Sequence, residues 1–222
     1  PPIGNMYEFS LAGGFAVALS YCLMSISRDL RWLGVFISIP VLLDLGLALT
    51  VLYTDSAQLV PALNSYWLAI HVSAAVLCLG AFTIGAALSG LYLVAQTAED
   101  RLVAGKEPGR SAAIAQRIPS ADRLDLMSYR IHAFMFPIWT FAVIAGAIWA
   151  EAAWGRYWGW DPKETWAFIT WVIYAAYLHA RATAGWRGKK AAYVAIAGYA
   201  AILFNYFIVN IYVQGLHSYS GL

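Results

Sequence analysis

Long apolar runs alternate with short polar segments along the whole chain. A helix that crosses a bilayer needs about 20 predominantly apolar residues, and six runs reach that length. They cover residues 6–26, 32–53, 66–95, 127–153, 165–185 and 189–214. The third run is long enough to extend past the membrane surface. The pattern predicts an all-α, polytopic integral membrane protein with about six transmembrane helices, organised as a single domain over residues 1–222.

Lysines and arginines gather on one set of the connecting segments. Arg156 and Lys163 lie on the opposite set. The other twelve of the fourteen basic residues lie within residues 27–31, 96–130 and 181–190. Because cytoplasmic loops are enriched in basic residues, we expect residues 96–126 to form a cytoplasmic linker. Both chain ends, and the loop near residue 160, are then predicted to be extracytoplasmic.

The composition narrows the class of protein further. Hydrophobic residues make up 61% of the chain and charged residues 12%, whereas a soluble domain carries about 25% charged residues. The mean hydropathy is +0.63, so soluble enzyme folds are excluded. The net charge of +2 is too small to indicate a nucleic-acid partner. Cys22 and Cys78 lie in apolar runs and are too few for a disulfide framework.

Tryptophan is concentrated in one segment, residues 149–171, which we call the tryptophan loop region. Six of the ten tryptophans lie there, and the four in its centre are Trp154, Trp158, Trp160 and Trp166. An interfacial belt of tryptophans is the simpler reading, but a belt needs no turn residues between its rings. Here glycines and Asp161-Pro162 separate the rings. This mixture favours an apolar platform for a large planar ligand.

Two of the four histidines flank this region on the predicted outer side. His71 lies about five residues inside the third apolar run, and His217 follows the last one. A histidine in a membrane segment is costly and usually functional. Two imidazoles facing a planar aromatic site are expected axial ligands of a haem iron. For either histidine alone, a hydrogen-bonded interfacial role is an equal alternative.

His179 and His132 lie at similar depth in the predicted inner leaflet. A second, inner haem site is therefore expected, with His179 as one ligand. Its other ligand is either His132 or a histidine of another subunit. For His132, a structural hydrogen bond near Arg130 is the favoured alternative.

Four further residues are weaker candidates. Asp44 lies in the middle of an apolar run, where a carboxylate is protonated or paired. We interpret it as a candidate hydrogen-bond partner of a ligand histidine. Asn210 shares a helical face with His217, or it makes an interhelical hydrogen bond. Arg156 and Lys163 either pair with haem propionates or are solvated loop charges.

Residues 154–166 read Trp-Gly-Arg-Tyr-Trp-Gly-Trp-Asp-Pro-Lys-Glu-Thr-Trp. This run resembles the WWD motif of haem-handling proteins. Its Asp-Pro-Lys-Glu continuation is similar to the CcsA (ResC) family of system II cytochrome c biogenesis. Other segments resemble boxes of that family in the same order along the chain. They are Asn5–Glu8, Tyr66–Val72, Tyr177–Arg181, and Asn210 with Gly215–Tyr219.

The resemblance implies a function and its residues. His71 and His217 would ligate haem b at an external WWD site formed with Trp154, Trp158, Trp160, Asp161 and Trp166. His179 would serve the inner site, completed by a histidine of a CcsB (ResB) partner, and His132 has no place in the family pattern. The reaction would attach haem to a Cys-x-x-Cys-His segment of apocytochrome c, as a holocytochrome c synthase (haem lyase).

The family works in the bacterial plasma membrane or the thylakoid membrane, with its active site on the extracytoplasmic face, and thiol-reducing proteins are further expected partners. The chain shows no dedicated nucleophile, so catalysis would consist mostly of positioning. Three alternatives stay open. A haem exporter would need the same ligands, a b-type electron carrier would need no tryptophan loop, and a non-haem transporter would be expected to have broken helices in matched halves.

Overall fold

The computed structural model describes residues 4–26, 29–55, 64–107 and 109–217, and these residues contain helices and no strands. The long helices are α1 (Met6–Ile26), α2 (Gly34–Thr50), α3 (Tyr66–Val103), α5 (Ala121–Trp154), α6 (Pro162–Thr183) and α7 (Lys189–Leu203). The short elements are η1 (Arg31–Leu33), α4 (Arg110–Ala115), the π-helix η3 (Phe204–Val209) and α8 (Asn210–Tyr212). The predicted all-α fold is confirmed.

Five helical stretches are long and apolar enough to cross a membrane: α1, η1 with α2, α3, α5, and α7 with η3 and α8. The sixth predicted run corresponds to α6. This helix has 22 residues, which is a length of about 33 Å, but its charged ends lower its mean apolarity. The chain is thus a polytopic membrane protein, while a membrane crossing by α6 and the sidedness of the bundle stay predictions.

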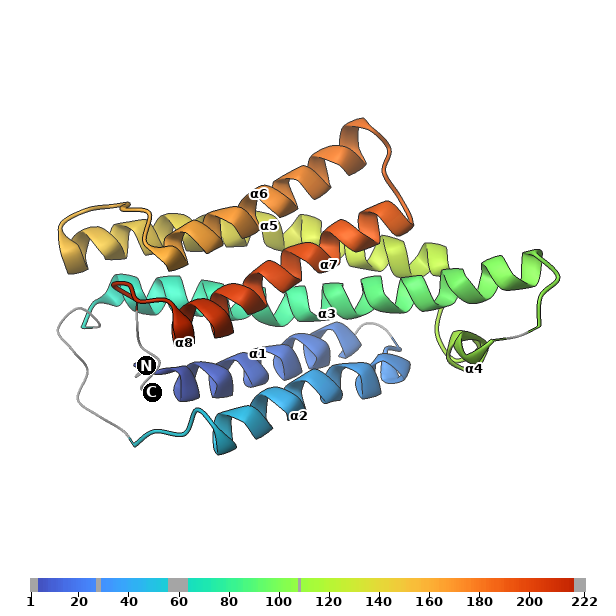
Figure 1. Ribbon diagram of the computed structural model, residues 1–222, viewed down its shortest axis with the longest axis horizontal. Coiled ribbons are helices and arrows are strands. Elements are labelled where there is room, and N and C mark those ends of the chain that lie inside the picture. Colours follow the sequence, from blue (N-terminus) through green and yellow to red (C-terminus); the bar gives the residue numbers. More distant parts are fainter. Residues whose placement is uncertain (1–3, 27–28, 56–63, 108, 218–222) are drawn as a thin grey trace.

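The helices run roughly parallel to one long axis, with α3 in the middle (Figure 1). α3 packs against α5 on one side and α1 on the other, α2 packs against α1, and α6 packs against α7. The α5–α6 loop, the start of α1 and the end of α8 all lie at one end of the bundle (Figure 1). The fold therefore brings the tryptophan loop close to segments from both ends of the chain.

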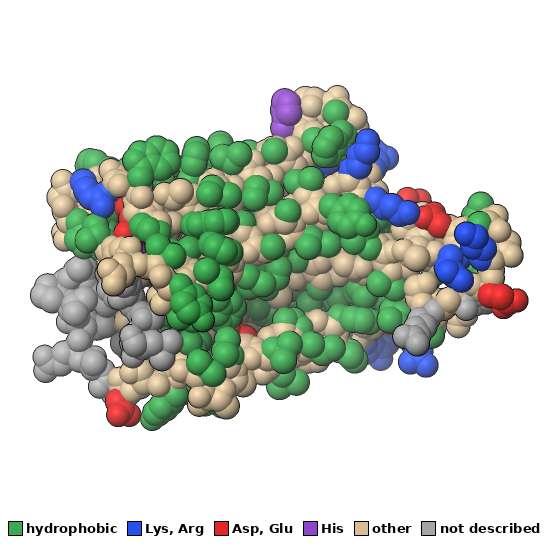
Figure 2. Space-filling view, in the orientation of Figure 1, with side chains coloured by type: hydrophobic (Ala, Val, Ile, Leu, Met, Phe, Trp, Pro, Cys, Tyr) green, Lys and Arg blue, Asp and Glu red, His purple; other side chains and the backbone are tan. Residues whose placement is uncertain are grey.

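The polar stretch expected to be a linker is partly helical. α3 continues to Val103 and α5 begins at Ala121, which leaves a shorter connection that contains α4. The side chain of Gln96 donates to Asp100 at 2.8 Å one turn further on, and such pairs stabilise an exposed helix end. Figure 2 shows Lys and Arg side chains gathered mainly at this end of the bundle, with apolar side chains along its middle. Arg28 and Pro108 lie outside the described residues.

An ion pair joins α5 to α6 near this polar end. The guanidinium of Arg181 donates to both carboxylate oxygens of Asp125, at 2.8 and 2.9 Å. The two side chains are 7% and 13% exposed. The guanidinium also lies 4.4 Å from the ring centre of Tyr129. This bidentate contact fixes how α6 lies against α5.

Candidate functional site

The Asp-Pro-Lys-Glu run begins helix α6 as a capping box. Asp161 accepts a hydrogen bond from the backbone N–H of Lys163 at 3.1 Å, and Pro162 occupies the first helical position. The Glu164 carboxylate accepts from the backbone N–H of Asp161 at 3.0 Å and of Gly159 at 2.9 Å. The two carboxylates thus accept hydrogen bonds from N–H groups that would be unpaired at a helix start, and proline at the first helical position has no N–H to pair. The motif thereby anchors the end of the tryptophan loop.

The backbone of the loop is held in two left-handed conformations. Gly155 follows the last residue of α5 with φ +70°, the usual glycine termination of a helix. Trp160 has φ +58°, which costs a non-glycine residue about 1–3 kcal/mol and tends to occur at functional sites. The ring of Trp160 is 65% exposed. The strained backbone conformation thus places the indole of Trp160 on the surface.

Asp161 also holds His217. Its carboxylate accepts from His217 Nδ1 at 2.9 Å and from the Leu216 backbone N–H at 2.7 Å. Burial alone would raise the pKa of Asp161, but these hydrogen bonds hold the pKa below its ordinary value. The ionised carboxylate accepts the Nδ1 proton, so the lone pair of His217 lies on Nε2. Trp149 and Trp154 pack edge-on against the imidazole, with ring centres at 5.3 and 4.7 Å.

His71 lies in the second turn of α3 and is held in the same way. Its Nδ1 donates to the backbone carbonyl of Ala142 at 2.8 Å, so Nε2 carries the lone pair here as well. Its ring lies nearly parallel to Trp149, with centres 6.2 Å apart. Gly146 makes this approach possible, because a Cβ there would lie 2.8 Å from two atoms of the imidazole.

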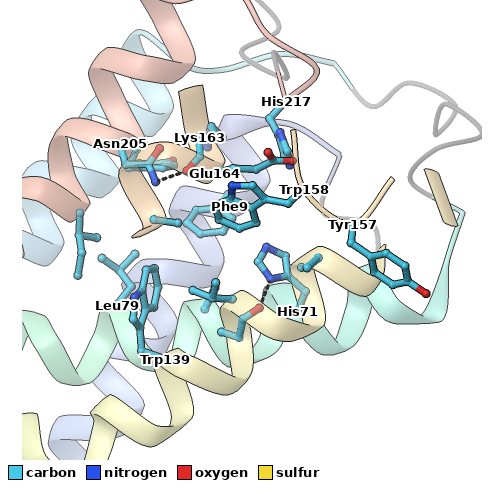
Figure 3. Close-up of a pocket in the computed structure, with 18 residues that line it drawn as sticks. Phe9, His71, Leu79, Trp139, Tyr157, Trp158, Lys163, Glu164, Asn205 and His217 are labelled. Atoms are coloured by element: carbon cyan, nitrogen blue, oxygen red, sulfur yellow. Dashed lines mark hydrogen bonds between the residues drawn. The ribbon is translucent and has the colours of Figure 1, made fainter. Parts of the chain in front are cut away.

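Both histidines line one cavity (Figure 3). Its described lining is mostly apolar and aromatic, with a polar edge. It includes Phe9, Leu79, Trp139, Tyr157, Trp158, Lys163, Glu164 and Asn205. In Figure 3, Trp158 lies between the levels of His71 and His217. A smaller cavity on the same histidines adds Met6, Trp149 and Asn210.

The ligands available here suit a metal that brings its own equatorial ligands. Among the described residues, no group of three or more His, Cys, Asp or Glu side chains is placed to hold a metal ion. A protein-only metal site needs three or four such ligands. Two imidazoles that line one aromatic cavity could serve as the axial ligands of a haem iron.

The residues of the tryptophan loop take different places around this cavity. Trp158 lines the cavity, and Trp154 supports His217 from behind. Asp161 also lies behind His217, although we expected it among the residues that bind the cofactor. Trp160 lies on the surface, and Trp166 lies against Phe204 with ring centres 4.1 Å apart.

The structure does not bring His132 and His179 together. His132 is fully buried and donates from Nδ1 to the Ser128 carbonyl at 2.8 Å. Its ring lies against Tyr174 and Tyr177 on the inward face of α6, at 5.0 and 5.3 Å. His179 is exposed on the outward face of the same helix.

The structure also shows where each of the four weaker candidates lies. Asp44 lines a separate cavity formed mainly by α1, α2 and α7, and no described contact links it to a site histidine. Asn210 is buried and lines the smaller histidine cavity. Lys163 lines both histidine cavities. The Arg156 guanidinium lies 3.9 Å from the Glu164 carboxylate. Ser218 and Tyr219 of the closing box lie outside the described residues.

Sequence reasoning missed several residues of this site. Phe9, Trp139 and Gly146 have no distinguishing local signal, because each looks like an ordinary residue of an apolar helix. Asn205 had a signal, since an amide inside an apolar run needs a partner. It donates to the Lys163 carbonyl at 3.2 Å and lies in the π-helix η3, an element that occurs frequently at functional sites. The Asp-x-x-Glu spacing is a further signal in the sequence, because it is typical of a capping box at a helix start.

Comparisons with known proteins identify the family to which the chain belongs. Residues 3–217 match the family described as Cytochrome C assembly protein. The chain is 38% identical to the cytochrome c biogenesis protein CcsA of Guillardia theta, over 100% of this chain and 77% of that protein. It is 38% identical to CcsA of a Synechocystis species, over 98% of this chain and 79% of that protein. Against CcsA of a Picosynechococcus species it is 35% identical, with 98% and 79% covered. The chain therefore belongs to the CcsA family of cytochrome c biogenesis proteins.

Proposed function

We propose that this chain binds haem b as its substrate between His71 and His217 and, with a CcsB (ResB) membrane partner, attaches it to the Cys-x-x-Cys-His segment of apocytochrome c. One observation carries the proposal. Two histidines that are distant in the sequence line one aromatic cavity, and each is held through Nδ1. Both Nε2 atoms are then the nitrogens available to ligate the iron.

The tryptophan loop would cover the macrocycle. Trp158 and Tyr157 line the cavity from the loop, and Trp149 supports both imidazoles. These rings would exclude water from the iron and restrict how the macrocycle lies. The loop lies at the predicted extracytoplasmic end, where apocytochrome c is expected.

Lys163 is the residue we assign to a haem propionate. Its side chain faces a mostly apolar cavity, and no ion pair to it is found among the described residues. A cation in such surroundings needs an anionic partner, and a carboxylate on the ligand would supply it. Arg156, beside Glu164 at the rim, would contact the second propionate.

The reaction itself needs positioning and no oxidant. Each cysteine thiol adds across a haem vinyl group: a sulfur–carbon bond forms at the inner vinyl carbon, and the thiol hydrogen is transferred to the outer carbon. The histidine of the apocytochrome segment then replaces one of the two protein imidazoles. The residues of the cavity would act by holding each vinyl group next to the thiol that adds to it.

The inner site would be shared with the partner. His179 lies on the outward face of α6, where a helix of another subunit can reach it. His132 lies on the other side of α6, in the core, so a CcsB histidine is the second ligand that fits. The b-type electron carrier is disfavoured because it would need no tryptophan loop, whereas here Tyr157 and Trp158 of that loop line the histidine cavity.

The first test is an optical spectrum of the complex purified with its CcsB partner. In a His179→Ala background, which removes the inner-site ligand of this chain, we expect a bis-histidine haem spectrum that is lost in His71→Gly and His217→Gly. Added imidazole should restore it, because imidazole occupies the space of the missing ring; a purely structural histidine would not be replaced in this way. Unchanged spectra and unchanged cytochrome c maturation in both variants would contradict the proposal.

A second measurement separates a synthase from a haem exporter. The haem-loaded complex is mixed with a reduced Cys-x-x-Cys-His peptide, and thioether product is measured by mass spectrometry. Covalent product that depends on both histidines is expected. Haem release without any thioether would assign the chain as an exporter.

A further inference from the structure

The smaller histidine cavity adjoins the larger one of Figure 3, at the end of the bundle that holds the tryptophan loop. Its described lining comes mainly from the start of α1, the first turns of α3, the end of α5 and the start of α8. On α3 it extends from Leu68 to Val72, whereas the larger cavity reaches Leu79, about two turns further along the helix. The smaller cavity is therefore the shallower one, measured from the predicted extracytoplasmic end.

One buried acceptor in the smaller cavity has no hydrogen-bond partner. Asn210 is 7% exposed, and its side-chain oxygen makes no hydrogen bond among the described residues. The neighbouring polar groups are paired, because Asn5 accepts from the Glu8 N–H at 2.8 Å and the Tyr206 hydroxyl donates to the Met6 carbonyl at 2.9 Å. A buried acceptor without a donor costs free energy. In the wall of a cavity it indicates a ligand that brings the donor.

The π-helix η3 sets the direction of Asn210. It ends at Val209, immediately before Asn210, and its wider turn contains one residue more than an α-helical turn. One extra residue rotates all that follows by about 100° around the helix axis. Within η3, Tyr206 is also joined to Ser10 of α1 by a hydrogen bond of 2.6 Å between their hydroxyls. The start of α1 and the end of η3 are thus held together as two walls of the cavity.

Both histidines of the site are oriented by an oxygen that accepts from Nδ1. The Ala142 carbonyl does this for His71 at 2.8 Å, and the Asp161 carboxylate does it for His217 at 2.9 Å. The proposed reaction brings a third imidazole, that of the Cys-x-x-Cys-His segment, which must also present Nε2 to the iron. The oxygen of Asn210 is a third acceptor, in a cavity that both protein histidines line.

We infer that the smaller histidine cavity receives the Cys-x-x-Cys-His segment of apocytochrome c and that Asn210 accepts the Nδ1 proton of its histidine. The inference rests on the proposed function. With Nδ1 held in this way, the lone pair of the incoming imidazole lies on Nε2, ready to replace a protein histidine on the iron. Because this histidine directly follows the second cysteine of the segment, holding it also places that thiol close to its vinyl group.

The charges around the smaller cavity favour a neutral incoming imidazole. No aspartate or glutamate is among its described lining residues, and Lys163 is the charged side chain there. An imidazolium would therefore have no counter-charge and would be disfavoured by the nearby lysine. Asn210 is uncharged and accepts equally well from a neutral ring. Because only the neutral imidazole ligates a metal, the cavity selects the form that can bind the iron.

The test measures how tightly two unreactive peptides bind to the haem-loaded complex with CcsB. Ser-x-x-Ser-His and Ser-x-x-Ser-Ala carry a fluorescent label, form no thioethers, and differ only in the histidine. We expect the unmodified protein to prefer the histidine peptide. Asn210→Leu should reduce this preference several-fold by weakening the histidine peptide alone. Gln214→Leu is the matched control, because Gln214 is an exposed amide one helical turn further along the chain, and it should leave both affinities unchanged.

Haem content and a second variant distinguish this role from a structural one. In the His179→Ala background, Asn210→Leu should hold bis-histidine haem at the normal level. Asn210→Asp keeps an acceptor oxygen and should retain the preference for the histidine peptide. An unchanged preference in Asn210→Leu, an equal loss of both peptides, or a loss of haem in that variant would each overturn the inference. If the unmodified haem-loaded complex binds neither peptide, the proposed attachment to apocytochrome c fails instead.

Discussion

Each cavity histidine is held through Nδ1, His217 by the carboxylate of Asp161 and His71 by the carbonyl of Ala142. The two hydrogen-bond acceptors differ in their dependence on pH. A carbonyl accepts a hydrogen bond at any pH, whereas a carboxylate accepts in the same way only while it is ionised. The orientation of His217 therefore depends on the charge of Asp161, and that of His71 depends on backbone geometry.

Substitutions of Asp161 distinguish its role as the cap of α6 from its role as the hydrogen-bond partner of His217. Asparagine caps a helix as well as aspartate does, so Asp161→Asn should keep the start of α6 and weaken the hold on His217. Losing a hydrogen bond to a charged group costs about 1.5–3 kcal/mol. We expect reduced bis-histidine haem in Asp161→Asn and a larger loss in Asp161→Ala, which also removes the cap. Equal haem loading in Asp161→Asn and the unmodified protein would contradict this role.

The same contact predicts a pH dependence. The pKa of Asp161 is lowered in the folded protein, so its stabilising contribution is fully present above the ordinary aspartate pKa, near 3.9. It is lost as the pH falls through the lowered folded pKa. Thermal unfolding of the haem-free protein in detergent should show this acid sensitivity. In Asp161→Asn the corresponding part of the pH dependence should be absent.

Gly146 tests the geometry around His71. A Cβ at Gly146 would lie 2.8 Å from the imidazole, whereas a Cβ at Gly90 meets no described atom within 4 Å. Alanine favours a helix over glycine by about 1 kcal/mol, so Gly90→Ala should be neutral or slightly stabilising. Gly146→Ala should displace His71 and lower haem binding. Paired measurements of haem content and thermal stability check this, and normal haem content in Gly146→Ala would refute it.

At the scale of elements, the start of α6 organises the tryptophan loop. Glu164 bonds two backbone N–H groups of the loop, those of Gly159 and Asp161. The capping box is therefore both a helix start and a loop clamp. It transmits the position of α6 to Trp158 in the cavity.

Removing this clamp should loosen the loop without unfolding the bundle. Glu164→Ala leaves two loop N–H groups unpaired, so we expect faster proteolysis within residues 155–161 and weaker haem binding. Glu151→Ala, at an exposed position near the end of α5, is the matched control. Identical cleavage rates in the two variants would show that the clamp has no such role.

At the scale of the whole molecule, two ion pairs connect helices that are distant in sequence. Arg181 with Asp125 joins α6 to α5 and is nearly buried, whereas Lys189 with Asp100 joins α7 to α3 and is about half exposed. A buried charge left without its partner is strongly destabilising, whereas an exposed pair contributes little because water screens it.

This contrast predicts unequal effects of matched changes. Asp125→Asn should destabilise the protein by about 3–5 kcal/mol, because Arg181 loses its counter-charge. Asp100→Asn should change stability little. Thermal unfolding of both variants in the same detergent measures the difference. Similar unfolding temperatures would contradict the assignment of Arg181–Asp125 as the main electrostatic contact between α5 and α6.

Much of the architecture was determined by the sequence alone. The apolar runs predicted the membrane helices, because the periodicity and length of an apolar run depend on neighbouring residues. Capping patterns such as Asp161 to Glu164 are also local, so the limits of the tryptophan loop are encoded there. The WWD-like run and the other boxes resembled the same family that the comparisons show.

Tertiary structure decided which residues share a site. His71 and His217 share one cavity because the start of α3 and the segment after α8 lie at the same end of the bundle, and no local pattern encodes that. The direction of a side chain around its helix decided that His132 is buried in the core and that His179 faces outward. Packing also recruited Phe9, Trp139 and Asn205 to the cavity. Such contacts depend on how helices distant in sequence lie against one another, which a single sequence does not reveal.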